Sequence, residues 1–213
     1  MDVINMKEFE HDLRQNIKGE VIVKEAVLGI YATDASNYQI MPRAVVVPCD
    51  NDDIREAVQI AAKYGISILP RGGGTSLGGQ AVGSSMIINF TKFMNKILEL
   101  NVDEGWVRVQ AGVILDELNA ELAKHGLLFA PDPATSSRAT IGGMIGNNAS
   151  GTKSIVYGIM RDHVIESTVL LSDGTVLTLS ELTAEEYDKR AQAGNGGSRE
   201  AEILSGFKRI IGE

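Results

Sequence analysis

The stretch LPRGGGTSLGGQ, residues 69–80, decides how the rest of the chain is interpreted. Three consecutive glycines follow a proline and an arginine, and two hydroxyl side chains and two more glycines come after them. Glycine adopts positive φ readily, so successive backbone N–H groups can turn toward one point and form an anion-binding nest. Gly72–Gly74 therefore indicate a phosphate or pyrophosphate site, with Thr75 and Ser76 adding hydroxyl donors at its edge. The alternative is a tight connection after a strand, with no ligand.

Two common phosphate-binding signatures do not fit this sequence. A Rossmann fingerprint, G-x-G-x-x-G, requires a glycine where Leu77 stands, three residues after Gly74. A Walker A loop has the pattern G-x-x-x-x-G-K-[ST], and GNNASGTKS (146–154) departs from it because Thr152 stands before the lysine. The glycines are therefore not interpreted as a Rossmann or NTPase site.

The composition is typical of a soluble globular protein, with 44% apolar and 23% charged residues in a chain of 213. No stretch approaches the roughly 20 apolar residues that span a bilayer as a helix, and the polar start MDVINMKEFEHD is no signal peptide. The net charge of −8 argues against nucleic-acid or anionic-membrane partners, but backbone N–H groups bind phosphate without net positive charge. A single cysteine, Cys49, excludes an internal disulfide or a cysteine-ligated cluster and favours a cytoplasmic location.

Before residue 100, short apolar runs alternate with helical patterns. AVVVP and ISILP are runs that a proline ends, which is typical of buried strands, and MIINF is a third strand. The helix between the first two is expected to begin at Asp50 or Asn51 and to end at Gly65. Its inner face is expected to carry Ile54, Val58 and Ala61 or Ala62. The expected elements are helices at 7–17 and about 50–64 and strands at 44–48, 66–70 and 86–90.

The second half favours an α+β arrangement with mostly antiparallel pairing. A hairpin is expected to turn at Asp173–Gly174, the chain from Thr183 is expected to be a charged loop, and the last helix exposes an apolar side. That exposed side suggests that the chain continues into a longer protein. The expected elements are a turn at 93–100, a strand at 106–112, a helix at 114–126, a glycine-rich region at 141–151, a hairpin at 164–180 and a helix at 199–213.

Four segments, in this order, carry a family resemblance: YATDAS, PRGGGTSLGGQAVG, PDPATSSRATIGGMIGNNASG and YGIMRDHV. The chain resembles the FAD-binding domain of the vanillyl-alcohol oxidase / p-cresol methylhydroxylase (PCMH) superfamily, in the branch acting on 2-hydroxy acids such as D-lactate, glycolate and 2-hydroxyglutarate. The resemblance implies an α+β, two-lobed PCMH-type fold, with a small α/β lobe and a larger lobe of mostly antiparallel sheet and flanking helices. The predicted domains are an N-terminal helical segment at 1–30 and the FAD-binding domain at 31–213, with lobes at about 31–100 and 101–213.

The resemblance also implies FAD as the cofactor and assigns its contacts. The loop from Arg71 to Ser76 is expected to surround the pyrophosphate, the second glycine-rich region to line the flavin and ribityl side, and the backbone near Val164 to meet the adenine. Some relatives attach FAD through a histidine just after the glycines, and Thr75 stands there, so we expect non-covalent FAD. The expected contacts are Arg71, Gly72, Gly73, Gly74, Thr75, Ser76, Asp132, Thr140, Gly142, Gly143, Asn147, Asn148, Gly151, Val164 and Ile165.

The resemblance implies a flavin-dependent oxidoreductase in which a 2-hydroxy acid gives a hydride to FAD and the electrons pass to a separate acceptor. A cap domain, absent from this chain, is expected to supply the substrate-binding and catalytic residues, so we assign no catalytic residue and no metal site here and expect this chain alone to be inactive. Arg161 and Asp162 are interpreted as an ion pair. The alternatives are a non-catalytic nucleotide- or phosphate-binding module and an FAD-binding subunit that a partner completes.

Overall fold

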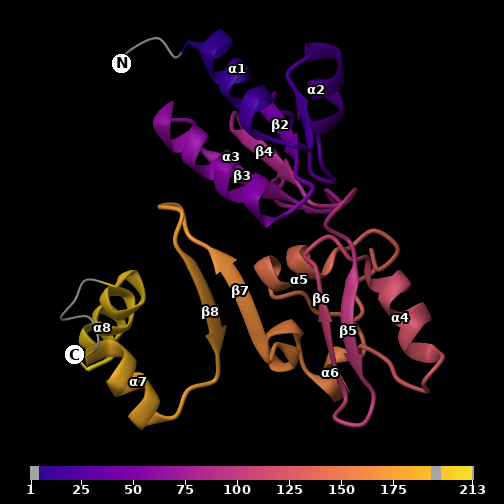
Figure 1. The fold of residues 1–213 in the computed structure, drawn as a ribbon. Coiled ribbons are helices and arrows are strands. Elements are labelled where there is room, and N and C mark those ends of the chain that lie inside the picture. The colour runs from indigo at the N-terminus through magenta and orange to yellow at the C-terminus, as the bar shows by residue number, and fades with distance from the viewer. Residues whose placement is uncertain (1–4, 193–197, 213) are drawn as a thin grey trace. The chain divides into compact units, whose positions relative to one another are not determined.

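The computed structural model of the chain describes residues 5–192 and 198–212. The chain divides into two compact units, Met1–His163 and Val164–Glu213, and the predicted division near residue 100 lies inside the first (Figure 1). Across the described ranges, every helix is too short or too polar to cross a membrane.

A four-stranded sheet forms the start of the first unit. Its order is β1-β2-β4-β3, in which β4 runs parallel to both of its neighbours and β1 pairs with β2 in the antiparallel sense. Every residue of β2 and of β4 is buried, as expected for parallel strands covered on both faces. Three of the strands confirm the prediction, and the short edge strand was not predicted. The strands are β1 (Glu20–Ile22), β2 (Ala44–Val47), β3 (Ile68–Arg71) and β4 (Met86–Asn89).

Helices cover both faces of this sheet (Figure 1). On one face, Leu28 of α2 (Glu25–Tyr31) packs against Val45, Val47 and Ile87. On the other lie α1 (Met6–Asn16) and α3 (Asn51–Lys63), which contact each other. The predicted helices at 7–17 and about 50–64 are therefore confirmed, and α2 was not predicted.

The start of α3 is anchored by a buried carboxylate. Asp50 caps the helix by accepting a hydrogen bond from Asp53 N, as predicted. Asp53 is 1% exposed, and its carboxylate accepts the backbone N–H groups of Lys18 (2.8 Å), Gly19 (3.0 Å) and Cys49 (2.8 Å). These three bonds compensate the burial of its charge and attach the segment before β1 to the end of β2.

The rest of the first unit contains one antiparallel strand pair and short helices. Residues 93–100 were predicted as a turn, and this is wrong, because β5 pairs there with β6. A bulge between Ile97 and Glu99 interrupts the alternation of exposure on which strand prediction depends. The elements are β5 (Ile97–Asn101), β6 (Trp106–Val109), α4 (Leu115–Ala123), α5 (Ile141–Asn147), α6 (Ser154–Tyr157) and the 3₁₀ helix η1 (Met160–His163).

The described residues of the second unit form a hairpin and two helices. Strands β7 (Glu166–Leu170) and β8 (Val176–Ser180) pair as predicted around Gly174, whose φ is +86°. The predicted loop after Thr183 is wrong, because α7 (Ala184–Gln192) begins there. Thr183 and Glu186 form a capping box, in which Thr183 N donates to the carboxylate (2.8 Å) and Glu186 N to the hydroxyl (3.2 Å). The final predicted helix is confirmed as α8 (Arg199–Ile211).

Candidate cofactor site

The glycine loop, here defined as Arg71–Gln80, directly follows β3. Within the described residues, the six backbone N–H groups from Gly72 to Leu77 donate to no acceptor of the chain. Most of this run is only partly exposed. Backbone N–H groups that are removed from water normally donate to an acceptor. A consecutive run of N–H groups without an acceptor is therefore a suitable surface for an anionic ligand.

Close contacts explain why the three consecutive positions are glycine. A Cβ on Gly72 would lie 2.1 Å from Thr140 Oγ1, and one on Gly73 would lie 2.2 Å from the Arg138 carbonyl oxygen. A Cβ on Gly74, whose φ is +66°, would lie 2.5 Å from Arg71 Nη2. These contacts involve no ligand, so the glycines themselves are accounted for by packing. The indication of a ligand comes from the unpaired N–H groups.

The Arg71 side chain is committed to backbone carbonyls. Its Nη1 donates to Tyr31 O (3.2 Å) and Ala81 O (2.6 Å), and its Nη2 donates to Thr33 O (2.8 Å). The guanidinium also lies over the Tyr31 ring, 5.7 Å from its centroid. Burial lowers the pKa of Arg71, and the charge of Asp34 opposes that shift. The residue predicted to contact FAD thus connects both ends of the glycine loop to the segment 31–33.

The YATDAS segment, residues 31–36, also supports the glycine loop through hydrogen bonds. Ala35 N donates to Gly74 O (3.2 Å), and the two oxygens of Asp34 accept Ser36 N (2.8 Å) and Ala81 N (3.2 Å). Burial alone would raise the pKa of Asp34, but these hydrogen bonds and the charge of Arg71 lower it overall. This motif had no predicted role, and its contacts indicate that it supports the loop.

The tip of the loop is closed by side chains. The Ser76 hydroxyl and the Gln80 amide oxygen are hydrogen-bonded, Gln80 N donates back to Ser76 Oγ (3.3 Å), and Gly78 N donates to Gln80 Oε1 (3.1 Å). Ser76 is therefore already engaged within the loop. The Thr75 hydroxyl has no hydrogen-bond partner among the described residues.

The second glycine-rich region is a helix with its donors already paired. Thr140 is 2% exposed and caps α5 by accepting Gly143 N (3.3 Å). Ile141 N donates to Val113 O (2.8 Å), Gly142 N to Ala111 O (2.9 Å) and Met144 N to Thr140 O (2.8 Å). The first turn of α5 therefore offers no free N–H group to a phosphate. The contact of Gly72 with Thr140 brings this region against the glycine loop.

Asp132 secures the turn after α5. Its Oδ1 accepts Lys153 N (3.0 Å), and its Oδ2 accepts the Thr152 hydroxyl (3.3 Å). A Cβ on Gly151 would lie 2.0 Å from the Asp132 carbonyl oxygen. Lys153, the lysine of the Walker-like stretch, lies with its Nζ 3.9 Å from Asp132, and no strand precedes α5 directly. This arrangement therefore does not fit the NTPase interpretation.

The remaining predicted contacts are dispersed. Asn147 is exposed, and Asn148 takes the left-handed conformation (φ +47°) while its Oδ1 accepts Arg161 N (3.0 Å). Val164 and Ile165 open the second unit, and Ile165 is 69% exposed. The ion pair predicted for Arg161 is present, with its Nε 3.6 Å from Asp162 Oδ1.

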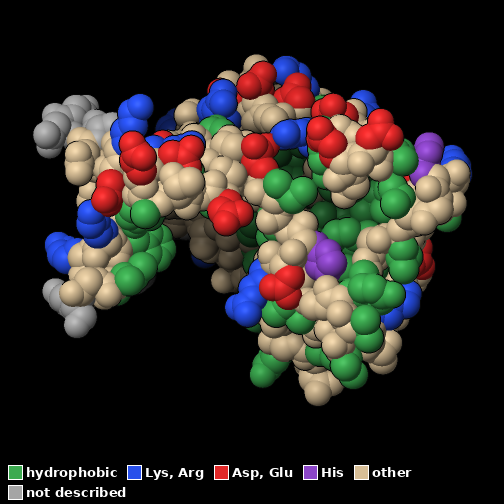
Figure 2. Space-filling model, turned by 90° about the horizontal axis from the view of Figure 1, so that it is seen from below, with side chains coloured by type: hydrophobic (Ala, Val, Ile, Leu, Met, Phe, Trp, Pro, Cys, Tyr) green, Lys and Arg blue, Asp and Glu red, His purple; other side chains and the backbone are tan. Residues whose placement is uncertain are grey.

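Apolar side chains are spread over the face drawn in Figure 2, among acidic and basic ones. In the first unit, Ile155, Val156 and Tyr157 of α6 are 93%, 77% and 57% exposed. They follow the second glycine-rich region directly, so its far edge is apolar.

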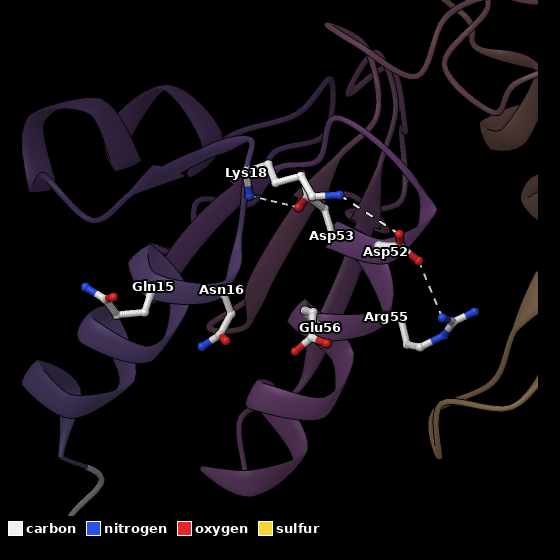
Figure 3. A pocket seen from close by; sticks show the side chains of 7 residues that line it. All are labelled: Gln15, Asn16, Lys18, Asp52, Asp53, Arg55 and Glu56. Carbon is white, nitrogen blue, oxygen red and sulfur yellow. Dashed lines mark hydrogen bonds and ion pairs between the residues drawn. The ribbon is translucent and has the colours of Figure 1, made fainter.

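A polar hollow of about 390 Å³ lies between the end of α1 and the start of α3 (Figure 3). Lys18 Nζ lies 2.8 Å from Asp50 Oδ2, and Arg55 Nη1 lies 3.5 Å from Asp52 Oδ1. These charges pair with one another, and the lining contains none of the predicted site residues. The hollow is lined by Gln15, Asn16, Lys18, Asp52, Asp53, Arg55 and Glu56.

Comparison with known proteins decides the family. The family model described as the FAD binding domain matches residues 42–180. The chain belongs to this FAD binding domain family. The predicted cofactor, FAD, is confirmed at the level of the family.

Curated relatives of this FAD binding domain are much longer than the chain itself. D-2-hydroxyglutarate dehydrogenase of Pseudomonas putida is 44% identical over 174 residues, which is 80% of this chain and 17% of that protein. The enzyme of the same name from Escherichia coli is 43% identical over 175 residues, covering 81% and 17%. D-lactate dehydrogenase [cytochrome], mitochondrial, of Kluyveromyces lactis is 39% identical over 140 residues, covering 64% and 24%.

Solved structures confirm the predicted fold class. An alkyldihydroxyacetonephosphate synthase matches with a TM-score of 0.73 at 24% identity, covering 84% of this chain and 35% of that one. A p-cresol methylhydroxylase matches with a TM-score of 0.72 at 20% identity, covering 81% and 35%. The FAD binding domain described here is therefore the α+β, PCMH-type fold.

The loop of this FAD binding domain fits a pyrophosphate in chemical character. Its free donors are neutral backbone N–H groups, and no acidic residue stands between Arg71 and Gln80. The carboxylate of Asp34, which supports the loop, already accepts Ser36 N and Ala81 N. Such donors can bind a pyrophosphate without any net positive charge on the protein.

Proposed function

We propose that this chain binds FAD non-covalently and forms the FAD-binding part of an oxidoreductase that acts on 2-hydroxy acids. The observation that carries the proposal is the run of free N–H groups from Gly72 to Leu77, enclosed by the YATDAS segment and Thr140. When bound, FAD supplies the redox chemistry, and the protein orients it and excludes water. The substrate class rests on the names of the relatives, which are dehydrogenases of D-2-hydroxyglutarate and D-lactate.

Each region has its own part in this proposal. The N–H groups of Gly72–Ser76 and the Thr75 hydroxyl bind the pyrophosphate, and the backbone at Val164 and Ile165 meets the adenine. The second glycine-rich region forms the flavin and ribityl side, through Asp132, Thr140, Gly142, Gly143, Asn147, Asn148 and Gly151.

Substrate binding, proton abstraction and electron transfer to an acceptor are assigned to groups other than these residues. Substrate-binding and proton-abstracting groups are placed in a cap domain, and the electrons pass to a separate acceptor. The proposed non-covalent attachment is supported by Thr75, which has no nucleophilic ring nitrogen with which to attach a flavin. A cytoplasmic location stays a prediction from the single cysteine.

The test is an absorbance spectrum of the purified chain before and after it is mixed with FAD and desalted. Flavin bands that elute with the folded protein and are released on denaturation are expected. Bands that survive denaturation would contradict non-covalent attachment. Protein that retains ADP but no flavin would favour the nucleotide-binding module instead. In a protein that joins this chain to a cap domain, bleaching of the flavin by D-2-hydroxyglutarate or D-lactate, but not by the L-isomers, tests the substrate class.

A further inference from the structure

We propose that Arg71 is a positioning residue, which fixes the shape of the pyrophosphate loop by binding three backbone carbonyls and does not itself contact FAD. This inference rests on the proposed function. It differs from the expectation that Arg71 is one of the direct FAD contacts.

Two of the three acceptors are distant from Arg71 in the sequence, and the third stands just after the loop. Tyr31, the last residue of α2, lies 40 residues from Arg71 in the chain, and Thr33, which follows α2, lies 38 residues away. Ala81 O stands just after the loop, 10 residues from Arg71. The guanidinium thereby joins the start of the loop, the residue that follows it and the supporting segment. A planar group with five N–H donors in a fixed arrangement is suited to such a task.

The surroundings of the guanidinium leave it little freedom. The Tyr31 ring covers one side at 5.7 Å, and the backbone of Gly74 lies so near that a Cβ there would be 2.5 Å from Nη2. Gly74 O in turn accepts Ala35 N (3.2 Å). The guanidinium and Ala35 therefore both act on the part of the loop that carries the free N–H groups.

The bonds of the guanidinium go to carbonyl oxygens, so they occupy no N–H donor of the loop. Arg71 fixes the backbone and leaves all the donors from Gly72 to Leu77 available. Asp34 supports the same arrangement by accepting Ala81 N (3.2 Å). A lysine has one nitrogen at the end of a flexible stem and cannot reproduce a planar contact that uses two nitrogens.

The experiment compares Arg71→Ala, Arg71→Lys and the matched control Arg43→Ala in the 213-residue chain. Arg43 also donates to a backbone carbonyl, Ser84 O (3.3 Å), so the control removes the same charge and the same type of bond outside the loop. Two quantities are measured, the FAD dissociation constant by flavin fluorescence and the hydrogen exchange of individual amides without FAD. The Ala35 and Ala81 amides report the loop, and those of Ile87 and Ile88 in β4 report global folding.

We expect both Arg71 variants to weaken FAD binding at least about tenfold and the control to stay within about twofold, since two or more hydrogen bonds of ordinary strength are lost. The Ala35 and Ala81 amides should exchange about tenfold faster in Arg71→Ala, while the β4 amides change much less. If Arg71→Lys keeps the affinity that Arg71→Ala loses, the side chain acts as a charge on the phosphate and the proposal is wrong. Unchanged exchange at Ala35 and Ala81 overturns it as well. If the wild-type chain binds no FAD, the proposed function fails, and the exchange result alone still decides whether Arg71 fixes the loop.

Discussion

The two glycine-rich regions of the first unit differ in where their backbone N–H groups go. From Gly72 to Leu77 the donors have no acceptor among the described residues, whereas the first turn of α5, from Ile141 to Met144, has every donor bonded within the chain. Both regions need glycine for close contacts, with Thr140 and Arg138 in the first and with Ala111 and Asp132 in the second. A glycine run therefore does not by itself indicate an anion site, and the state of its N–H groups distinguishes the two cases.

A polar side chain supports each region, and the two side chains also differ in whether they use the N–H groups of their region. Arg71 donates to carbonyl oxygens and leaves the N–H groups of its loop free. Asp132 accepts an N–H group and a hydroxyl of the turn at 152–153, so it removes donors from that region. The N–H groups of the first region are therefore still available to a ligand, whereas those of the turn in the second region are not.

The largest expected effect is a loss of stability when a closely packed glycine of the second region is replaced. Gly151→Ala places a methyl group against the Asp132 carbonyl and should lower the free energy of unfolding by about 3 kcal/mol, the upper end of ordinary overpacking. Gly146→Ala is the matched control, because a Cβ there meets nothing within 4 Å and alanine favours a helix by about 0.5–1 kcal/mol. Urea unfolding without FAD, followed by circular dichroism, measures both. Equal stability of the two variants would show that the close contact at Gly151 does not exist in solution.

Much of the sheet could be predicted from the sequence because its signals are local. The β-branched run at 44–47 and the apolar run at 86–89 are buried on both faces, and such strands need no partner to be recognised. The helix α7 was missed although Thr183 and Glu186 carry the capping-box spacing, so a usable signal was present. For β5, the bulge removed the alternation that would have revealed it.

The support of the glycine loop could not be predicted in the same way. Arg71 binds the carbonyl oxygens of Tyr31 and Thr33, which are 38–40 residues away, and a backbone carbonyl leaves no trace in residue identity. Likewise, the sequence indicates where N–H groups lie but not which of them find acceptors in the folded chain. The sequence therefore indicates the glycine loop as a candidate region, but it does not indicate which of its groups support the loop and which stay free.

Two variants with smaller expected effects distinguish a loss of FAD binding from a loss of stability. Each variant removes one hydroxyl, one in each glycine-rich region. Thr75→Val removes a hydroxyl without a partner in the described chain, so FAD should bind about fivefold more weakly, or about 1 kcal/mol, with little change in unfolding without FAD. Ser154→Ala removes the acceptor of Gly151 N (3.0 Å) and should lower the free energy of unfolding by about 1 kcal/mol while the folded protein keeps its FAD affinity. Fluorescence titration and urea unfolding of both variants give the two quantities. The comparison fails if Thr75→Val changes only stability or Ser154→Ala changes only FAD affinity.

The smallest expected effect is a dependence of FAD retention on acid pH. The hydrogen bonds of Asp34 and the nearby Arg71 lower its pKa in the folded state, so its contribution to the loop is fully present above the unfolded value of about 3.9. That contribution is lost as the pH falls through the lower, folded pKa. FAD retention by the wild type should therefore decline more steeply below about pH 4 than retention by Asp34→Asn, which accepts one N–H group at any pH.

The matched control for this pH effect lies in the hairpin of the second unit. Asp173 also has a lowered pKa, because its carboxylate accepts Thr175 N (2.9 Å), but it supports a turn between β7 and β8. Asp173→Asn should leave the pH dependence of FAD retention as in the wild type. Flavin fluorescence after desalting at each pH measures it for the three proteins. A curve for Asp34→Asn that coincides with the wild type would assign the acid sensitivity to other carboxylates, and the support of the loop by Asp34 would then be independent of its charge.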